Sequence, residues 1–132
     1  MSGTPPIVTL ASTLHYMVGF GFSIGSLPFA LYVLANRRLP VFLGIRFYGG
    51  SFIEQSGGID AVMASSLAYV LITSVNVLVG YWLAQSMRLG GILGLLLFPV
   101  GMFFALGYGA PIPIVIHPIM ALVIILAWGH LR

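Results

Sequence analysis

Four long apolar runs, separated by very few charged residues, constrain the fold of this chain more than any other feature. The runs cover residues 9–36, 61–87, 90–108 and 112–131. The charged residues lie beside or between these runs and are Arg37, Arg38, Arg46, Glu54, Asp60, Arg88 and Arg132. They make up 5% of the chain, whereas a soluble domain carries about a quarter. We therefore expect lipid, and not water, to surround most of the protein.

The lengths of the apolar runs predict membrane-spanning helices. A helix of about 20 apolar residues crosses a hydrocarbon core of roughly 30 Å. We predict an all-α integral membrane protein in which four transmembrane helices form one domain, an up-down bundle, over residues 1–132. With four spans, both termini lie on one face of the membrane. The arginines are divided too evenly between the two faces to set the orientation of the bundle.

Residues 37–60 form the predicted connection between the first two spans. Its central part, residues 41–53, is too short to cross a membrane and too apolar for a free loop. We favour an interfacial segment that holds Arg46 at the lipid headgroups, and a re-entrant loop is the alternative. Gly57 and Gly58 are expected to break the chain just before the second span.

Small residues at helical spacing predict close contacts between helices. Gly21 and Gly25 form such a pair in the first run, and the third run carries a similar surface of Gly90, Gly94 and Gly101. Helix backbones approach closely at small side chains, and this contact drives helix association within lipid. The pattern therefore predicts a compact bundle, without identifying a dimer.

The second run carries a stripe of polar side chains. Its members recur at spacings of three and four, which places them on one helical face: Ser66, Tyr69, Thr73 and Asn76. Asn76 lies near the middle of the membrane, where an unpaired amide is costly, so we expect it to point into the bundle and to have a partner. Interhelical hydrogen bonding against the first or third helix is the favoured role of this stripe. The lining of a solute path is the alternative.

The histidines are further candidates for chemistry. His117 lies in an apolar run, toward the membrane face that also carries Glu54, Asp60 and Arg46. These four residues form a candidate titrating or ligand-binding site. We expect the His117 ring to face protein, within hydrogen-bond reach of residues 37–60 or of an ordered water. A purely structural histidine is the alternative.

His15 and His130 form a second candidate site, because both lie toward the face of the termini. A haem held by two histidines needs them at matching depths on neighbouring helices, and a metal ion needs three or four converging ligands. Neither face offers enough ligands, so we predict no metal and no cofactor. The chain has no cysteine, which excludes disulfides and thiol catalysis.

The sequence favours a function in association, as an accessory subunit of a larger membrane complex or as a homo-oligomer. The expected partners are the lipid bilayer and other membrane subunits or further copies of the chain, and the composition suits a prokaryotic cell membrane. A transporter or channel for a small solute or a proton is the alternative. A lipid-binding protein or enzyme at the membrane interface is the third possibility. A net charge of +3, spread over both faces, does not suit nucleic-acid binding.

Overall fold

The computed structural model describes residues 3–132, which fold into a helical bundle with one short β-hairpin. The helices are α1 (Pro6–Asn36), α2 (Phe52–Ala84), α3 (Arg88–Tyr108) and α4 (Pro111–Ala127), and the 3₁₀ turn η1 (Trp128–His130) follows. Within the described residues, four helical segments are long and apolar enough to cross a membrane, with α4 taken together with η1. The predicted all-α class and the four helices of spanning length are confirmed.

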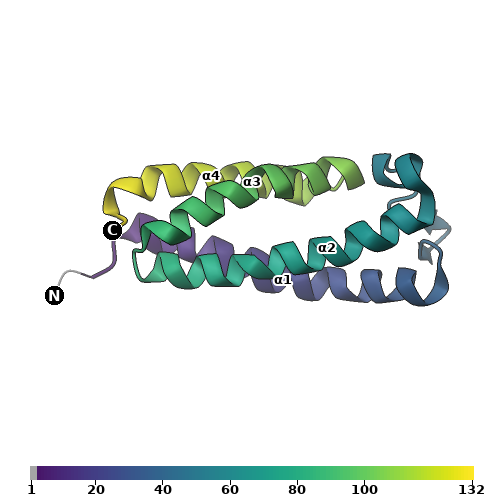
Figure 1. Cartoon of the computed structure of the whole chain (residues 1–132), viewed down its shortest axis with the longest axis horizontal. Coiled ribbons are helices and arrows are strands. Elements are labelled where there is room, and N and C mark those ends of the chain that lie inside the picture. The colour runs from purple at the N-terminus through teal and green to yellow at the C-terminus, as the bar shows by residue number, and fades with distance from the viewer. Residues whose placement is uncertain (1–2) are drawn as a thin grey trace.

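α1 and α2 are longer than a bilayer requires. α1 has 31 residues, which at 1.5 Å per residue gives a length of about 46 Å, and the part of α2 after its break at Gly58, residues 59–84, is about 39 Å long. α3 has 21 residues, close to the length that a hydrocarbon core of about 30 Å requires. Figure 1 shows α1 and α2 extending past the ends of α3 and α4. We call this the connection end, and we call the end with the start of α1 and η1 the terminal end.

α2 begins earlier than the sequence predicts. Its first residue is Phe52, and the Ser51 hydroxyl caps the helix by accepting a hydrogen bond of 3.3 Å from the backbone N–H of Glu54. Gly58 has φ 64° and ψ −152°, so the helix is broken there, as the glycine pair predicts. The connection is therefore residues 37–51. The predicted connection of residues 37–60 also contains the short helical segment before the break, which the Ser51 cap stabilises.

The connection contains a two-stranded hairpin that the sequence did not indicate. β1 (Val41–Phe42) pairs antiparallel with β2 (Ile45–Arg46), and the turn residues Leu43 and Gly44 have φ of 52° and 79°. Two successive residues with positive φ form a turn that matches the twist of a hairpin. All residues from 41 to 50 are exposed, so none is buried between helices as a re-entrant loop requires. This exposure agrees with an interfacial segment, and the depth of the hairpin in a membrane stays a prediction.

Glycines bring α1 and α2 into close contact. A Cβ on Gly19 would lie 2.7 Å from the backbone N of Val77, and a Cβ on Gly80 would lie 3.1 Å from the carbonyl oxygen of Ser12. The Ser12 hydroxyl donates a hydrogen bond of 2.8 Å to the Gly80 carbonyl. The missing side chains therefore let the two helices approach within hydrogen-bond distance.

Two apolar clusters occupy the two ends of the bundle interior. The cluster at the terminal end includes Val8, Val79, Leu83 and Ile124. The cluster at the connection end includes Val33, Leu39, Ile53, Val62 and Phe104. Of the buried polar side chains of α1 and α2, His15, Thr73 and Asn76 fall between the two clusters along each helix, whereas Ser12 and Ser66 lie within the span of one cluster. The middle of the bundle is therefore its most polar part.

Candidate functional site

A cavity of about 330 Å³ lies between α1 on one side and α2, α3 and the start of α4 on the other. We call it the aromatic cavity, because aromatic side chains form much of its wall: Phe22, Phe29, Tyr69, Phe104 and Tyr108. Serine side chains also line it. No charged side chain of the described chain is part of the lining.

The aromatic cavity has a buried floor and an exposed rim. Ser66 and Ala105 lie at the floor and are 4% and 1% exposed, whereas Gly21 and Gly25 of α1 and Ile112 of α4 are exposed at the rim. A Cβ added at Gly21 or Gly25 would meet no atom within 4 Å. The prediction that this glycine pair packs closely against another helix is therefore wrong. The pair instead leaves the cavity open on the side between α1 and α4.

The connection covers the outer end of the aromatic cavity. Phe47 and Tyr48, which we call the aromatic lid, line the cavity from the connection. The Tyr48 ring lies edge-on to two rings of the wall, with centroid distances of 5.3 Å to Phe29 and 5.1 Å to Tyr108. Aromatic pairs at such distances stabilise each other beyond the effect of the area they bury. The lid is therefore packed against both α1 and α3.

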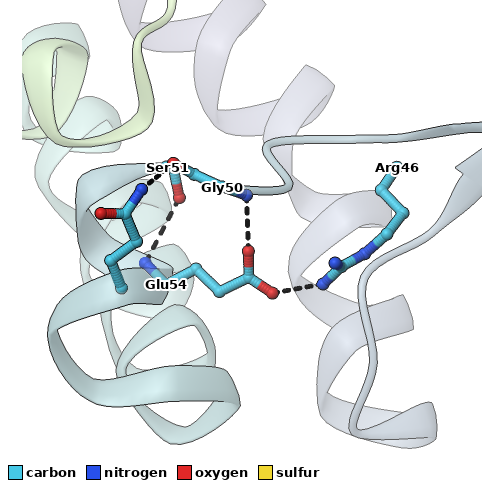
Figure 2. Close-up of polar contacts among 5 residues, drawn as sticks. Arg46, Gly50, Ser51 and Glu54 are labelled. Atoms are coloured by element: carbon cyan, nitrogen blue, oxygen red, sulfur yellow. Dashed lines mark hydrogen bonds and ion pairs between the residues drawn. The ribbon is translucent and has the colours of Figure 1, made fainter.

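A network around Glu54 holds the connection against the start of α2 (Figure 2). The Glu54 carboxylate accepts a hydrogen bond of 2.6 Å from the backbone N–H of Gly50 and forms an ion pair with Arg46. The side-chain amide of Gln55 donates a hydrogen bond of 2.6 Å to the Gly50 carbonyl. Arg46 and Gly50 flank the aromatic lid in the sequence, so the network fixes both ends of the lid.

The site that the sequence predicts around His117 does not form. Glu54 and Arg46 pair with each other, and Asp60 pairs with Arg37 at 2.7 Å. In the described part of the chain, no hydrogen bond or ion pair joins His117 to any of these residues. The prediction is wrong because the acids and arginines meet and neutralise each other at the connection end, whereas His117 lies inside the bundle.

A second, much smaller space lies in the middle of the bundle. We call it the inner compartment; its volume is about 10 Å³, and residues from all four helices line it. Its polar lining residues are His15 of α1, Tyr69, Thr73 and Asn76 of α2, and His117 of α4. Tyr69 also lines the aromatic cavity, so this side chain lies between the two spaces.

The predicted polar stripe of α2 is buried, but its members bond within their own helix. Ser66, Thr73 and Asn76 are at most 4% exposed. The Asn76 amide donates to the Thr73 carbonyl at 3.2 Å, and the Thr73 hydroxyl donates to the Tyr69 carbonyl at 2.8 Å. The Ser66 hydroxyl likewise donates to the Met63 carbonyl, three residues earlier. The favoured role of this stripe, hydrogen bonding between helices, is therefore wrong.

Hydrogen bonds between helices come from hydroxyl groups outside that stripe. The Ser12 hydroxyl bonds α1 to α2 at Gly80, and the hydroxyl oxygens of Ser65 and Tyr108 lie 2.5 Å apart and bond α2 to α3. Ser65 directly precedes Ser66 in the sequence, about 100° away around the helix. Which of the two serines meets the neighbouring helix depends on the rotation of α2, and the sequence pattern leaves that rotation open.

The ring of His117 faces the protein interior, as predicted, but it has no partner in the connection. His117 is 6% exposed, and a Cβ added at Gly101 would lie 2.7 Å from its Cε1. The Phe22 ring lies edge-on to it, with a centroid distance of 6.4 Å. His117 Nε2 and the Tyr69 hydroxyl are both buried, and neither has a hydrogen-bond partner in the described part of the chain. Of the two partners predicted for this ring, residues 37–60 supply none, and an ordered water stays a prediction.

His15 shares the inner compartment with His117 and does not pair with His130. His15 is 1% exposed, and its Nδ1 donates a hydrogen bond of 2.8 Å to the Ala11 carbonyl, whereas His130 is exposed in η1. The second predicted site is therefore wrong. At 1.5 Å per residue, His15 lies about 14 Å from the start of α1 and His117 about 9 Å from the start of α4, and the two helices run in opposite directions. Both rings thus reach the middle, although the sequence assigned them to different faces.

The two rings do not converge on one point. A Cβ on Gly94 would lie 3.1 Å from His15 Nε2, whereas His117 lies against Gly101. These two glycines are two turns apart, which places the rings about 10 Å apart along α3. No group of three or more His, Cys, Asp or Glu side chains that could hold a metal ion occurs within residues 3–132. The rings therefore border a hydrogen-bonding space between them.

Comparison with known proteins found no relative of this chain. No family model matches it, and neither the curated proteins nor the solved structures include a significant match. Its function is therefore inferred from the geometry of the aromatic cavity and the inner compartment.

Proposed function

We propose that this protein is an integral membrane protein, with its four helices in an up-down bundle, that binds a small uncharged solute in the aromatic cavity. The cavity itself is the observation that supports this proposal. Its volume of about 330 Å³ falls in the range of ligand sites, which is roughly 300–1,000 Å³. Binding is the step that a transporter, a channel and a carrier of such a solute have in common.

The lining indicates the class of solute. Aromatic rings dominate the wall, and Ser26, Ser66 and Tyr69 carry hydroxyl groups. A charged solute would lose its hydration in such a space without gaining an opposite charge, which is strongly unfavourable. A neutral molecule with an aromatic ring and one or two hydrogen-bonding groups matches the wall, because rings pack well edge-on or offset against other rings.

The outer surface of the bundle supports placement in a membrane. Large apolar side chains more than 60% exposed occur on all four helices, among them Met17, Leu71, Leu96 and Leu126. Water would solvate such a surface poorly, whereas lipid tails solvate it well. The open side of the aromatic cavity between α1 and α4 then faces lipid, so a lipid-soluble molecule enters it directly from the bilayer.

Association with a partner subunit or a second copy is the function that the sequence alone favours, and it stays a prediction. The aromatic cavity favours solute binding, because an open, mostly apolar pocket of about 330 Å³ with a few polar groups in its wall is typical of ligand sites.

The test is saturable binding of a neutral aromatic probe. The protein is reconstituted in lipid nanodiscs, and the fluorescence of 2-naphthol is titrated against empty nanodiscs, which measure partition into lipid. Wild-type protein should show saturable binding above partition. Gly25→Phe should weaken it at least tenfold, because the ring fills a part of the cavity where a Cβ meets no atom within 4 Å.

The matched control is Ala64→Phe, which adds the same ring at an exposed position of α2 outside the cavity. This variant should bind 2-naphthol as the wild type does. Signals identical to empty nanodiscs, or equal binding by the two variants, would contradict the proposal.

A further inference from the structure

Two buried polar atoms in the middle of the bundle have no protein partner. They are the Tyr69 hydroxyl and His117 Nε2, and both side chains line the inner compartment. His117 as a whole is 6% exposed. The great majority of buried polar atoms in proteins are hydrogen-bonded, either to protein or to ordered water. A hydrogen-bonding ligand in this compartment would satisfy both atoms.

The size of the compartment limits what that ligand is. A volume of about 10 Å³ corresponds to one water-sized molecule, for which roughly 10–15 Å³ is needed. A buried water also needs two to four polar partners, and apolar voids of similar size stay dry. Tyr69 and His117 supply two partners, and the side chains of Thr73 and Asn76 border the same space.

His15 adds a further hydrogen-bonding atom to the wall. Its Nδ1–H is used by the Ala11 carbonyl, so Nε2 of the neutral ring has a lone pair that accepts a hydrogen bond. The compartment is therefore bordered by a phenol and by two imidazoles, and every charged side chain of the described chain lies outside its lining. Such a wall suits an uncharged molecule that both donates and accepts hydrogen bonds.

We propose that the inner compartment binds one water molecule, which bridges the Tyr69 hydroxyl and His117 Nε2. The bridge joins α2 to α4 and fixes the Tyr69 side chain, which also lines the aromatic cavity. The water requires no solute, so this inference stands or falls independently of the proposed function.

Solid-state NMR of the protein in lipid bilayers, with ¹⁵N-labelled histidine, tests the bridge directly. A water-to-nitrogen correlation should appear at His117 Nε2 in the absence of any solute. His15 Nδ1 is the internal control, because its proton is held by the Ala11 carbonyl. His117→Phe assigns the signal by removing it. A wild-type spectrum without a water correlation at His117 Nε2 would overturn the proposal.

Removal of the Tyr69 hydroxyl gives a second measurement of the same bridge. Tyr69→Phe keeps the ring that packs against Phe104 at a centroid distance of 5.7 Å and removes only the hydroxyl. It should weaken the water correlation at His117 severalfold, whereas Tyr81→Phe, at a position 54% exposed, should leave it unchanged.

A double-mutant cycle gives an independent measurement, from the melting temperatures of the wild type, Tyr69→Phe, His117→Leu and the double variant. Two groups that share one water are coupled, so the melting temperature of the double variant should fall by less than the sum of the two single decreases. Additive losses would show that no water joins the two side chains.

Discussion

Gly94 and Gly101 determine where the two buried imidazole rings lie. Each glycine leaves the surface of α3 open at a point that a histidine ring of another helix occupies. A methyl group at either position would overlap that ring, so α3 would have to move away from α1 or α4. At the scale of single residues, the inner compartment therefore depends on two missing side chains as much as on the polar ones.

Gly101→Ala should destabilise the protein by about 1–3 kcal/mol, the usual cost of adding atoms to a well-packed interior. The added Cβ would lie 2.7 Å from Cε1 of the buried His117 ring. The measurement is unfolding of the purified protein in detergent, followed by circular dichroism.

Gly25→Ala is the matched control for this change, because its Cβ meets no atom within 4 Å. It should be neutral or raise the stability by up to about 1 kcal/mol, since alanine favours a helix more than glycine does. Equal effects of the two substitutions would show that His117 does not pack against Gly101.

At the scale of elements, the connection holds the aromatic lid through the network around Glu54. The contact of the Ser51 hydroxyl with Glu54 is local, and the other three contacts of this network reach back to Arg46 or Gly50. Leu43 and Tyr48 have positive φ, a conformation that side chains other than glycine adopt at a cost. The contacts of Glu54 and Tyr48 offset that cost and keep the lid in place.

Glu54→Gln should loosen the lid without unfolding the bundle. Arg46 is 58% and Glu54 21% exposed at the side chain, so loss of the ion pair should cost no more than about 1 kcal/mol. We expect faster amide hydrogen exchange at Gly50 and severalfold weaker binding of 2-naphthol, because the ends of the lid are less restrained.

Asp60→Asn serves as the comparison for this variant. It removes the pair with Arg37, whose partners are 61% and 75% exposed and do not flank the lid. Exchange at Gly50 and probe binding should match the wild type. The role of Glu54 would be refuted by identical exchange in the two variants.

At the scale of the whole molecule, the structure places the start of α1 and the end of α4 at one end and the hairpin at the other (Figure 1). The chain contains no cysteine, so single cysteines report on membrane sidedness without further substitutions. Gly3→Cys and Gly129→Cys should react with an impermeant maleimide from the same side. Leu43→Cys, at a position 86% exposed, should react from the opposite side.

The measurement uses separate preparations of sealed right-side-out and inside-out vesicles. Lysed vesicles give full labelling as the reference. Neither Gly3 nor Gly129 has an atom within 4 Å of an added Cβ, so both substitutions should preserve the fold. Labelling of Gly3→Cys and Leu43→Cys from one side would exclude the up-down arrangement in the membrane.

The sequence by itself determined the helical class, the number of helices of spanning length and the break at Gly58. The reason is physical: lipid offers no hydrogen bonds to a backbone, so a long apolar run has to satisfy its own in a helix. Gly58 takes a φ of 64° at the break, a conformation that glycine adopts far more readily than other residues. These outcomes depend on interactions between residues close together in the sequence, so the sequence alone predicts them.

Only the tertiary structure decided which polar residues meet. Gly21 and Gly25 border open space, whereas Gly94 and Gly101 lie against rings, although both pairs looked equally suited to close packing. His15 and His117 line the same compartment because the positions at which α1 and α4 begin set the depth of each ring in the bundle. The rotation, tilt and offset of each helix depend on all its neighbours together, and these quantities place a side chain in a cavity, against a ring or in lipid.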